Sequence, residues 1–239
     1  MEYLGVAVNG ISIIIGVTIG LFFTKINEKM KETIMMAIGL VVLVIGLTMA
    51  FESQRIVVVI LSLISGALIG EKYNWEQKLN RIGEKLEKRF KQNNTNSKIA
   101  EGFVTATLIF GIGAMAVVGS LDSGLRGDHE ILFTKSFIDG FVSLVLTTTL
   151  GVGVIFSVFP IVLYQGAIVF FATQIHELIT DQFLDMFIIE MTATGGILIV
   201  VLGLNMLKIT SIRVANLLPS LITVGFILYA YVQLESLMF

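Results

Sequence analysis

The chain has 239 residues, of which 55% are hydrophobic and 14% are charged, whereas an ordinary soluble domain has about 45–50% apolar and about 25% charged residues. Its net charge is −2 and it contains no cysteine. These values exclude most soluble proteins, a basic nucleic-acid-binding surface, disulfides and thiolate metal sites. The hydrophobic residues come in runs of about 20, the length of helix that crosses a bilayer. The sequence therefore predicts a multi-pass membrane protein.

Eight apolar runs predict about eight transmembrane helices and an all-α membrane fold. Lysine and arginine indicate the orientation, because short cytoplasmic loops carry an excess of them. With the N-terminus outside, thirteen of the 16 basic residues fall in cytoplasmic loops and three fall outside. We therefore expect both termini outside and the polar stretch 71–98 in the cytoplasm. The predicted spans lie near residues 3–23, 34–51, 56–70, 100–121, 132–157, 159–176, 187–207 and 214–235.

The polar stretch from Glu71 to Lys98 carries an apolar stripe with helical spacing. Its members are Trp75, Leu79, Ile82, Leu86 and Phe90. Because basic residues flank this stripe, we expect an amphipathic helix over residues 71–91 that lies on the cytoplasmic membrane interface. The alternative is a helix that binds a partner or a second copy in solution.

Two parts of the chain resemble each other and indicate an internal duplication. GLVVLVIGLTM at 39–49 aligns without gaps with GILIVVLGLNM at 196–206, and RIVVVILSLI from Arg55 aligns with RVANLLPSLI from Arg213. Asn9-Gly10 in the first span falls roughly opposite Gln165-Gly166 in the sixth. Because an odd number of spans separates corresponding helices, spans 1–3 and 6–8 are expected to be inverted repeats.

The duplication divides the predicted chain into four parts. Residues 1–70 form the first three-helix repeat, 71–98 the cytoplasmic amphipathic helix and linker, 99–158 a central helix pair with an external loop, and 159–239 the second, inverted three-helix repeat. The central pair shows a weaker similarity of its own, GFVTATLIFGIG from Gly102 against GFVSLVLTTTLG from Gly140. The alternative is chance alignment between helices rich in glycine, leucine and valine.

Several motifs resemble a family of bacterial multi-pass membrane proteins. The most specific are GAMAVVGS, the GD of GLRGDH, and RVANLLP, and they are joined by LFTKSFIDG and TATGGILIVVLGLN. With them, nearly the whole chain is similar to the family catalogued as domain of unknown function 554. The resemblance implies a prokaryotic inner-membrane protein with several spans. It implies no substrate.

Polar residues beside flexible backbone form the candidate binding site. Broken or flexible helices at matching places in two inverted halves are typical of substrate sites in transporters, and Asn9-Gly10 and Gln165-Gly166 form such a pair. Pro219 is expected to free the carbonyl group of Ala215 next to Asn216. Interhelical hydrogen bonding is the alternative role for the amides. The predicted substrate or ion site comprises Asn9, Gln165, Glu190, Thr194, Asn205 and Asn216.

Charged residues within or near the spans complete the candidate site. Lys135 and Asp139 lie one helical turn apart in the fifth span, so we expect an ion pair inside the membrane. Glu190 shares a helix face with Thr194 and is suited to take up a proton or a hydrated cation, or alternatively to favour a helix N-terminus. In the external loop, Asp122 and Asp128 are expected to collect cations at an entrance, or to be solvated charges in a turn.

These features predict a small secondary transporter or channel for a small cation or small polar solute, with a midplane site at the repeat interface and Glu190 as the coupling group. No enzyme is expected, because the sequence has no HExxH motif, P-loop or GxSxG motif. We also expect no cofactor and no nucleic acid, and we assign no metal. The expected partners are the lipid bilayer, the small ion or solute, and a second copy of the chain. The alternative is a non-transporting scaffold or sensor that acts through the cytoplasmic helix 71–91.

Overall fold

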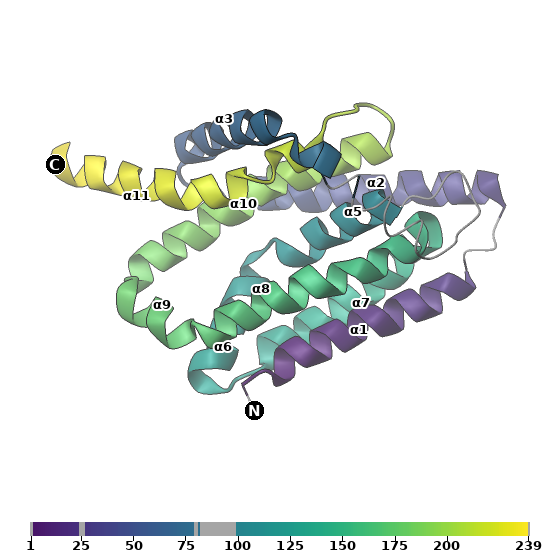
Figure 1. Cartoon of the computed structure of the whole chain (residues 1–239), viewed down its shortest axis with the longest axis horizontal. Helices are drawn as coiled ribbons and strands as arrows, with labels where there is room; N and C mark the ends of the chain where they lie inside the picture. Colours follow the sequence, from purple (N-terminus) through teal and green to yellow (C-terminus); the bar gives the residue numbers. More distant parts are fainter. Residues whose placement is uncertain (1, 24–26, 79–80, 82–98, 239) are drawn as a thin grey trace. The chain divides into compact units, whose positions relative to one another are not determined.

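The computed structural model describes residues 2–23, 27–78, 81 and 99–238, and these residues contain helices but no strand (Figure 1). The all-α fold predicted from the sequence is therefore confirmed. The elements are α1 (Leu4–Phe22), α2 (Glu28–Ala50), α3 (Ile56–Tyr73), α5 (Ile99–Gly111), α6 (Ala114–Arg126), α7 (Glu130–Leu150), the 3-10 helix η1 (Gly151–Ser157), α8 (Val158–Phe170), α9 (Ala172–Leu178), α10 (Asp181–Met206), the 3-10 helix η2 (Val214–Leu217) and α11 (Ser220–Met238).

Six helical segments in the described part of the chain are long and apolar enough to cross a membrane, or seven if a bent pair counts as one span. The bent pair is α5 and α6, whose axes differ by 62°. One of the six segments, Glu130–Phe170, is 41 residues long. A straight helix of that length would measure about 60 Å, twice the thickness of the hydrocarbon core of a bilayer.

Contacts divide the chain into two compact units that interleave along the sequence. The first consists of Met1–Ala37 and Asn80–Thr180, and the second of Ile38–Leu79 and Asp181–Phe239. The predicted domains followed the order of the chain, whereas each compact unit combines segments that are far apart in sequence. Helix α2 begins in the first unit and ends in the second.

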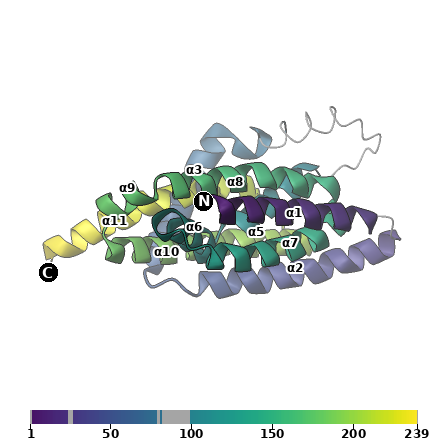
Figure 2. The ribbon, with the colours of Figure 1, turned by 90° about the horizontal axis from the view of Figure 1, so that it is seen from below.

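In the first unit, α1 packs along α7 in the parallel direction. An added Cβ atom on Gly5 would lie 2.8 Å from the Leu132 side chain, and one on Gly20 would lie 2.6 Å from the carbonyl oxygen of Leu144. The two helices therefore run in the same direction. Their glycines let the two backbones approach closely. Figures 1 and 2 both show the two helices side by side.

Helix α1 packs against α8 in the opposite direction. Val6 clusters with Val169, whereas an added Cβ on Gly10 would meet Val162 and Val158. Since α7 is parallel to α1 and α8 is antiparallel to it, the chain reverses direction at η1. The 41-residue apolar segment thus contains two helices that run in opposite directions.

Two glycines with positive φ mark helix breaks at matching places in this unit. Gly113 has φ 136° and separates α5 from α6, and Gly151 has φ 69° and separates α7 from η1. These glycines occupy the same position in the two similar segments that begin at Gly102 and Gly140. Side chains with a Cβ atom rarely adopt such φ values, so the helices break here. The apolar runs had predicted spans over 100–121 and 132–157 without these breaks.

In the second unit, α10 contacts α2, α3 and α11. Glycine pairs join α2 to α10 in an antiparallel crossing. An added Cβ on Gly46 would lie 2.8 Å from the carbonyl oxygen of Gly196, and one on Gly203 would lie 2.9 Å from that of Gly39. Gly39 and Gly46 on α2 thus face Gly203 and Gly196 on α10, and the missing side chains permit this close approach.

Helices α3 and α11 form a second antiparallel crossing in this unit, and they lie side by side in Figure 1. Ser65 and Thr223 meet at the crossing with their hydroxyl oxygens 3.1 Å apart. The Thr223 hydroxyl is also 3.1 Å from the carbonyl oxygen of Ser62. Gly66 permits this approach, because an added Cβ there would lie 2.6 Å from the Cα of Ser220.

Two local expectations change in the second unit. Pro219 lies between η2 and α11, and the carbonyl of Ala215 accepts the N–H of Leu218 at 3.3 Å, so this carbonyl is not free as expected. Helix α3 continues past the predicted end at residue 70 to Tyr73, where Asn74 ends it with φ 50°. The predicted amphipathic helix 71–91 lies mostly outside the described residues.

We predict that replacing Gly46 by leucine destabilises the protein. A larger side chain at the α2–α10 crossing meets the Val200 nitrogen and the Gly196 carbonyl oxygen, and overpacking of this kind costs about 1–3 kcal/mol. Thermal unfolding in detergent, followed by size-exclusion chromatography, measures the effect. Val44→Leu is the matched control, because Val44 is exposed on the same helix. Equal melting temperatures for the two variants would contradict the crossing.

Candidate functional site

The first unit contains a buried amide pair between α1 and α8. The Asn9 side chain donates Nδ2–H to Oε1 of Gln165 at 3.1 Å, and both side chains are completely buried. This contact joins the two residues that the sequence analysis placed opposite each other. It brings together two members of the predicted site that are 156 positions apart.

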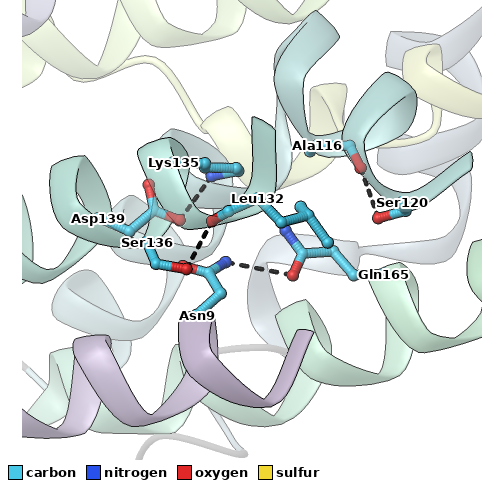
Figure 3. A network of polar contacts seen from close by, with 8 residues as sticks. All are labelled: Asn9, Ala116, Ser120, Leu132, Lys135, Ser136, Asp139 and Gln165. Atoms are coloured by element: carbon cyan, nitrogen blue, oxygen red, sulfur yellow. Dashed lines mark hydrogen bonds and ion pairs between the residues drawn. The ribbon is translucent and has the colours of Figure 1, made fainter. Parts of the chain in front are cut away.

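An ion pair on α7 lies beside the amide pair (Figure 3). Lys135 Nζ donates to Asp139 Oδ2 at 2.5 Å, and both residues are buried. The predicted ion pair is therefore present, and it forms one cluster with the amides. We call Asn9, Lys135, Asp139 and Gln165 the four-residue cluster.

The four-residue cluster contains unused hydrogen-bonding capacity. Asn9 Oδ1 and Gln165 Nε2 are buried and have no partner. By contrast, the nearby hydroxyl groups of Ser136 and Ser120 donate to carbonyl oxygens of their own helices, at 2.6 Å and 2.7 Å (Figure 3). A buried donor or acceptor without a partner costs about 1–3 kcal/mol. The cluster therefore offers one free acceptor and one free donor to a ligand.

Glu190 on α10 lies in the second unit and holds the start of α3. Its Oε1 accepts the N–H groups of Gln54 and Arg55 at 2.9 Å and 2.8 Å, and its Oε2 accepts the Ser53 hydroxyl at 2.7 Å. A carboxylate is a favourable acceptor for the free N–H groups at a helix N-terminus. Both oxygens of Glu190 are thus engaged in positioning another helix.

The other predicted site residues of the second unit also bind backbone groups. Thr194 donates to the carbonyl oxygen of Glu190 at 2.7 Å. Asn216 accepts the N–H of Glu76 at 2.8 Å, while Glu76 accepts the N–H of Ala215 at 3.0 Å. Glu76 therefore holds the start of η2 much as Glu190 holds the start of α3. Glu76 was missed from the sequence, because it is one of many charged residues in the polar stretch 71–98 and has no distinguishing local signal.

Asn205 closes the loop between α10 and η2. Its amide nitrogen donates to the carbonyl oxygen of Ile212 at 2.7 Å, and its Oδ1 accepts the N–H of Ile212 at 3.1 Å and the Thr210 hydroxyl at 2.7 Å. These three bonds satisfy the amide within its own loop. The geometry gives Asn205 an anchoring role.

The predicted external entrance residues lie around the turn between α6 and α7. Asp122 pairs with Arg126 one turn later, with 3.6 Å between Oδ1 and Nη1. Asp128 accepts the N–H of Glu130 at 3.0 Å, as expected for a residue just before a helix. Among the described residues, no three histidine, aspartate or glutamate side chains are grouped closely enough to hold a metal ion.

The predicted site residues thus fall into two groups. Asn9, Gln165, Lys135 and Asp139 meet in the first unit, with two polar atoms unpaired. Glu190, Thr194, Asn205 and Asn216 belong to the second unit, where their hydrogen bonds go mainly to backbone groups and one polar atom, Asn216 Nδ2, is unpaired. We therefore take the four-residue cluster as the candidate functional site.

We predict that Glu190→Leu destabilises the protein whereas Glu190→Gln does not. Leucine leaves two backbone N–H groups without an acceptor, at about 1–3 kcal/mol for each, while glutamine keeps one acceptor oxygen for both. Melting temperatures in detergent measure the difference. Thr192→Val is the matched control, because Thr192 is buried on the same helix and its hydroxyl has no partner. A stable Glu190→Leu variant would contradict the anchoring role.

Comparison with known proteins places the chain among helical membrane proteins. It is 32% identical over 235 residues to the uncharacterised membrane protein YdfK of Bacillus subtilis, covering 95% of this chain and 97% of YdfK. It is 26% identical over 223 residues to the uncharacterised protein YqgA of Escherichia coli, covering 92% and 93% of the two chains. No solved structure matches. Residues 4–229 match the model of the family of proteins of unknown function DUF554, and the chain belongs to this family.

Proposed function

We propose that this protein is a small transporter or channel that moves a small cation or a small polar solute across the bacterial inner membrane. The observation that carries this proposal is the four-residue cluster in the first unit. Its side chains come from three apolar helices, are buried, and leave one acceptor and one donor unused.

The cost of such a cluster supports a functional role. A charged side chain at the centre of a membrane helix costs about 2.5–3.5 kcal/mol on insertion scales, and such residues commonly lie on substrate or ion pathways. Pairing Lys135 with Asp139 offsets part of this cost. It does not account for the two unpaired amide atoms, since a purely structural pair of amides would gain from satisfying them.

Antiparallel contacts between corresponding helices support the proposed inverted duplication. Asn9 on α1 meets its predicted counterpart Gln165 on α8. Ser65 on α3 meets Thr223 on α11, and these two residues come directly after the aligned segments 55–64 and 213–222. Helices α2 and α10 cross through aligned glycines. A contact between equivalent positions is what two-fold related copies make at their common axis, and inverted repeats are a common architecture of transporters.

The proposed topology has eight spans, with both termini outside and the loop 71–98 in the cytoplasm. Six segments in the described part of the chain are long and apolar enough to cross a membrane. The reversal of the chain at η1 supports counting Glu130–Phe170 as two spans, which makes seven, and the bent pair α5–α6 is the eighth. Lysine and arginine then concentrate on the cytoplasmic side. We propose no enzymatic activity, because the cluster lacks a nucleophile paired with a base.

The proposed function predicts flux that depends on Asp139. Purified protein in liposomes is tested for uptake of ⁸⁶Rb⁺, ²²Na⁺, [¹⁴C]urea and [¹⁴C]glycine against protein-free liposomes. We expect at least one probe to enter faster, and Asp139→Asn to slow that entry about tenfold, since an ionic hydrogen bond contributes about 1.5–3 kcal/mol.

Thr147→Val is the matched control for this measurement. Thr147 is buried on the same helix and donates to the carbonyl oxygen of Ser143 at 2.7 Å, so its loss removes a polar group without touching the four-residue cluster. The proposal fails if no probe enters faster than in protein-free liposomes, or if Asp139→Asn transports like the wild type. The scaffold or sensor role would then be the better account.

The proposed orientation predicts opposite labelling of two introduced cysteines. The chain has no native cysteine, so single substitutions report without background. Arg126→Cys should react with a membrane-impermeant maleimide in intact spheroplasts, because Arg126 is exposed at the outer end of α6. Lys78→Cys should react only after the membrane is permeabilised. The reverse pattern would invert the proposed topology.

A further inference from the structure

We propose that the four-residue cluster binds a small solute of zero net charge that carries both a hydrogen-bond donor and an acceptor, such as an amide or a zwitterion, and does not bind a bare metal cation. This inference rests on the proposed function and narrows its substrate class. It follows from the charge of the cluster and from the two unpaired amide atoms.

The charge of the four-residue cluster is balanced internally. Lys135 and Asp139 are 2.5 Å apart and contribute one positive and one negative charge, while Asn9 and Gln165 are neutral. A cation that enters meets an aspartate already paired with an ammonium group, and that ammonium repels it. An anion meets the corresponding repulsion from Asp139. A ligand without net charge avoids both penalties.

The oxygen ligands of the cluster are also too few for a dehydrated divalent cation. Calcium takes about 6–8 oxygen ligands and magnesium requires an octahedral set. The cluster has one buried side-chain oxygen without a partner, Asn9 Oδ1. Four side-chain oxygens belong to the cluster, those of Asn9, Gln165 and Asp139, which is fewer than either ion requires, and the Asp139 carboxylate is already paired with Lys135.

The two unpaired atoms differ in kind, and together they match a ligand with mixed polarity. Asn9 Oδ1 accepts a hydrogen bond and Gln165 Nε2 donates one. Rotating both amides by 180° exchanges the atoms but still leaves one free donor and one free acceptor. The cluster therefore has one free donor and one free acceptor in either orientation of the two amides.

Selectivity of the wild-type protein tests this inference. Liposomes containing the protein are assayed with [¹⁴C]urea, [¹⁴C]acetamide and [¹⁴C]glycine as uncharged or zwitterionic probes, and with ⁸⁶Rb⁺, ²²Na⁺ and ⁴⁵Ca²⁺ as cations. We expect entry of at least one of the first three probes at about ten times the protein-free rate, a ratio that corresponds to about 1.4 kcal/mol. Cations should enter at the protein-free rate.

The outcomes separate the inference from the proposed function. Uptake of a cation without uptake of any uncharged or zwitterionic probe would overturn the inference while supporting transport. Uptake of none of the six probes would overturn both. Uptake of an uncharged or zwitterionic probe that is lost in Asn9→Leu and in Gln165→Leu supports both, and it assigns binding to the unpaired amide atoms.

A charge variant gives an independent test. Lys135→Met leaves Asp139 without its partner and gives the cluster a net charge of about −1. We expect it to lose uptake of the uncharged or zwitterionic probe about tenfold and to gain uptake of ⁸⁶Rb⁺ or ²²Na⁺. Lys135→Met/Asp139→Asn restores neutrality and should exclude cations again. Unchanged selectivity in Lys135→Met would overturn the inference, and the wild-type assay decides it if Lys135→Met does not fold.

Discussion

Close antiparallel crossing of helices is the constraint on which the rest of this structure depends. In a membrane, the hydrophobic effect contributes little to the association of helices. Small residues that allow close backbone contact therefore decide which helices pair. Gly46 and Gly196 do this for α2 and α10, and Gly66 does it for α3 and α11. In the first unit, the approach of α1 and α8 brings Asn9 within hydrogen-bond distance of Gln165. The amide pair of the candidate site therefore forms only when α1 and α8 pack against each other.

Acidic side chains solve a second problem, the free N–H groups at helix starts inside apolar surroundings. Glu190 from α10 accepts two N–H groups at the start of α3, and Glu76, beyond the end of α3, accepts one at the start of η2. Each carboxylate comes from outside the helix it serves, so each one also joins two elements. In the sequence, Glu190 looks like a functional intramembrane charge, whereas Glu76 has no such signal. Their geometry shows that an intramembrane carboxylate can be fully occupied in holding the fold.

The sequence predicted the features that have a strong local signal. Apolar run length identified the helices, and the spacing of Lys135 and Asp139 predicted their ion pair. The breaks at Gly113 and Gly151 were missed, because glycine is common within membrane helices and only the backbone reveals a positive φ. Glu190 was assigned to coupling, since the sequence does not show that residues 53–55 fold back onto it. Long-range hydrogen bonds of this kind depend on which helices pair, and local patterns do not contain that information.

The two halves of the four-residue cluster differ in when they can form. Lys135 and Asp139 lie one turn apart on a single helix, so their charges can neutralise each other as α7 enters the membrane. Asn9 and Gln165 lie 156 residues apart and can meet only after α1 and α8 have packed. The ion pair therefore lowers the cost of inserting the site, whereas the unpaired amide atoms arise from assembly. A movement that separated α1 from α8 would dismantle the amide pair and leave the ion pair intact, so the proposed binding of a ligand depends on the position of α1 relative to α8.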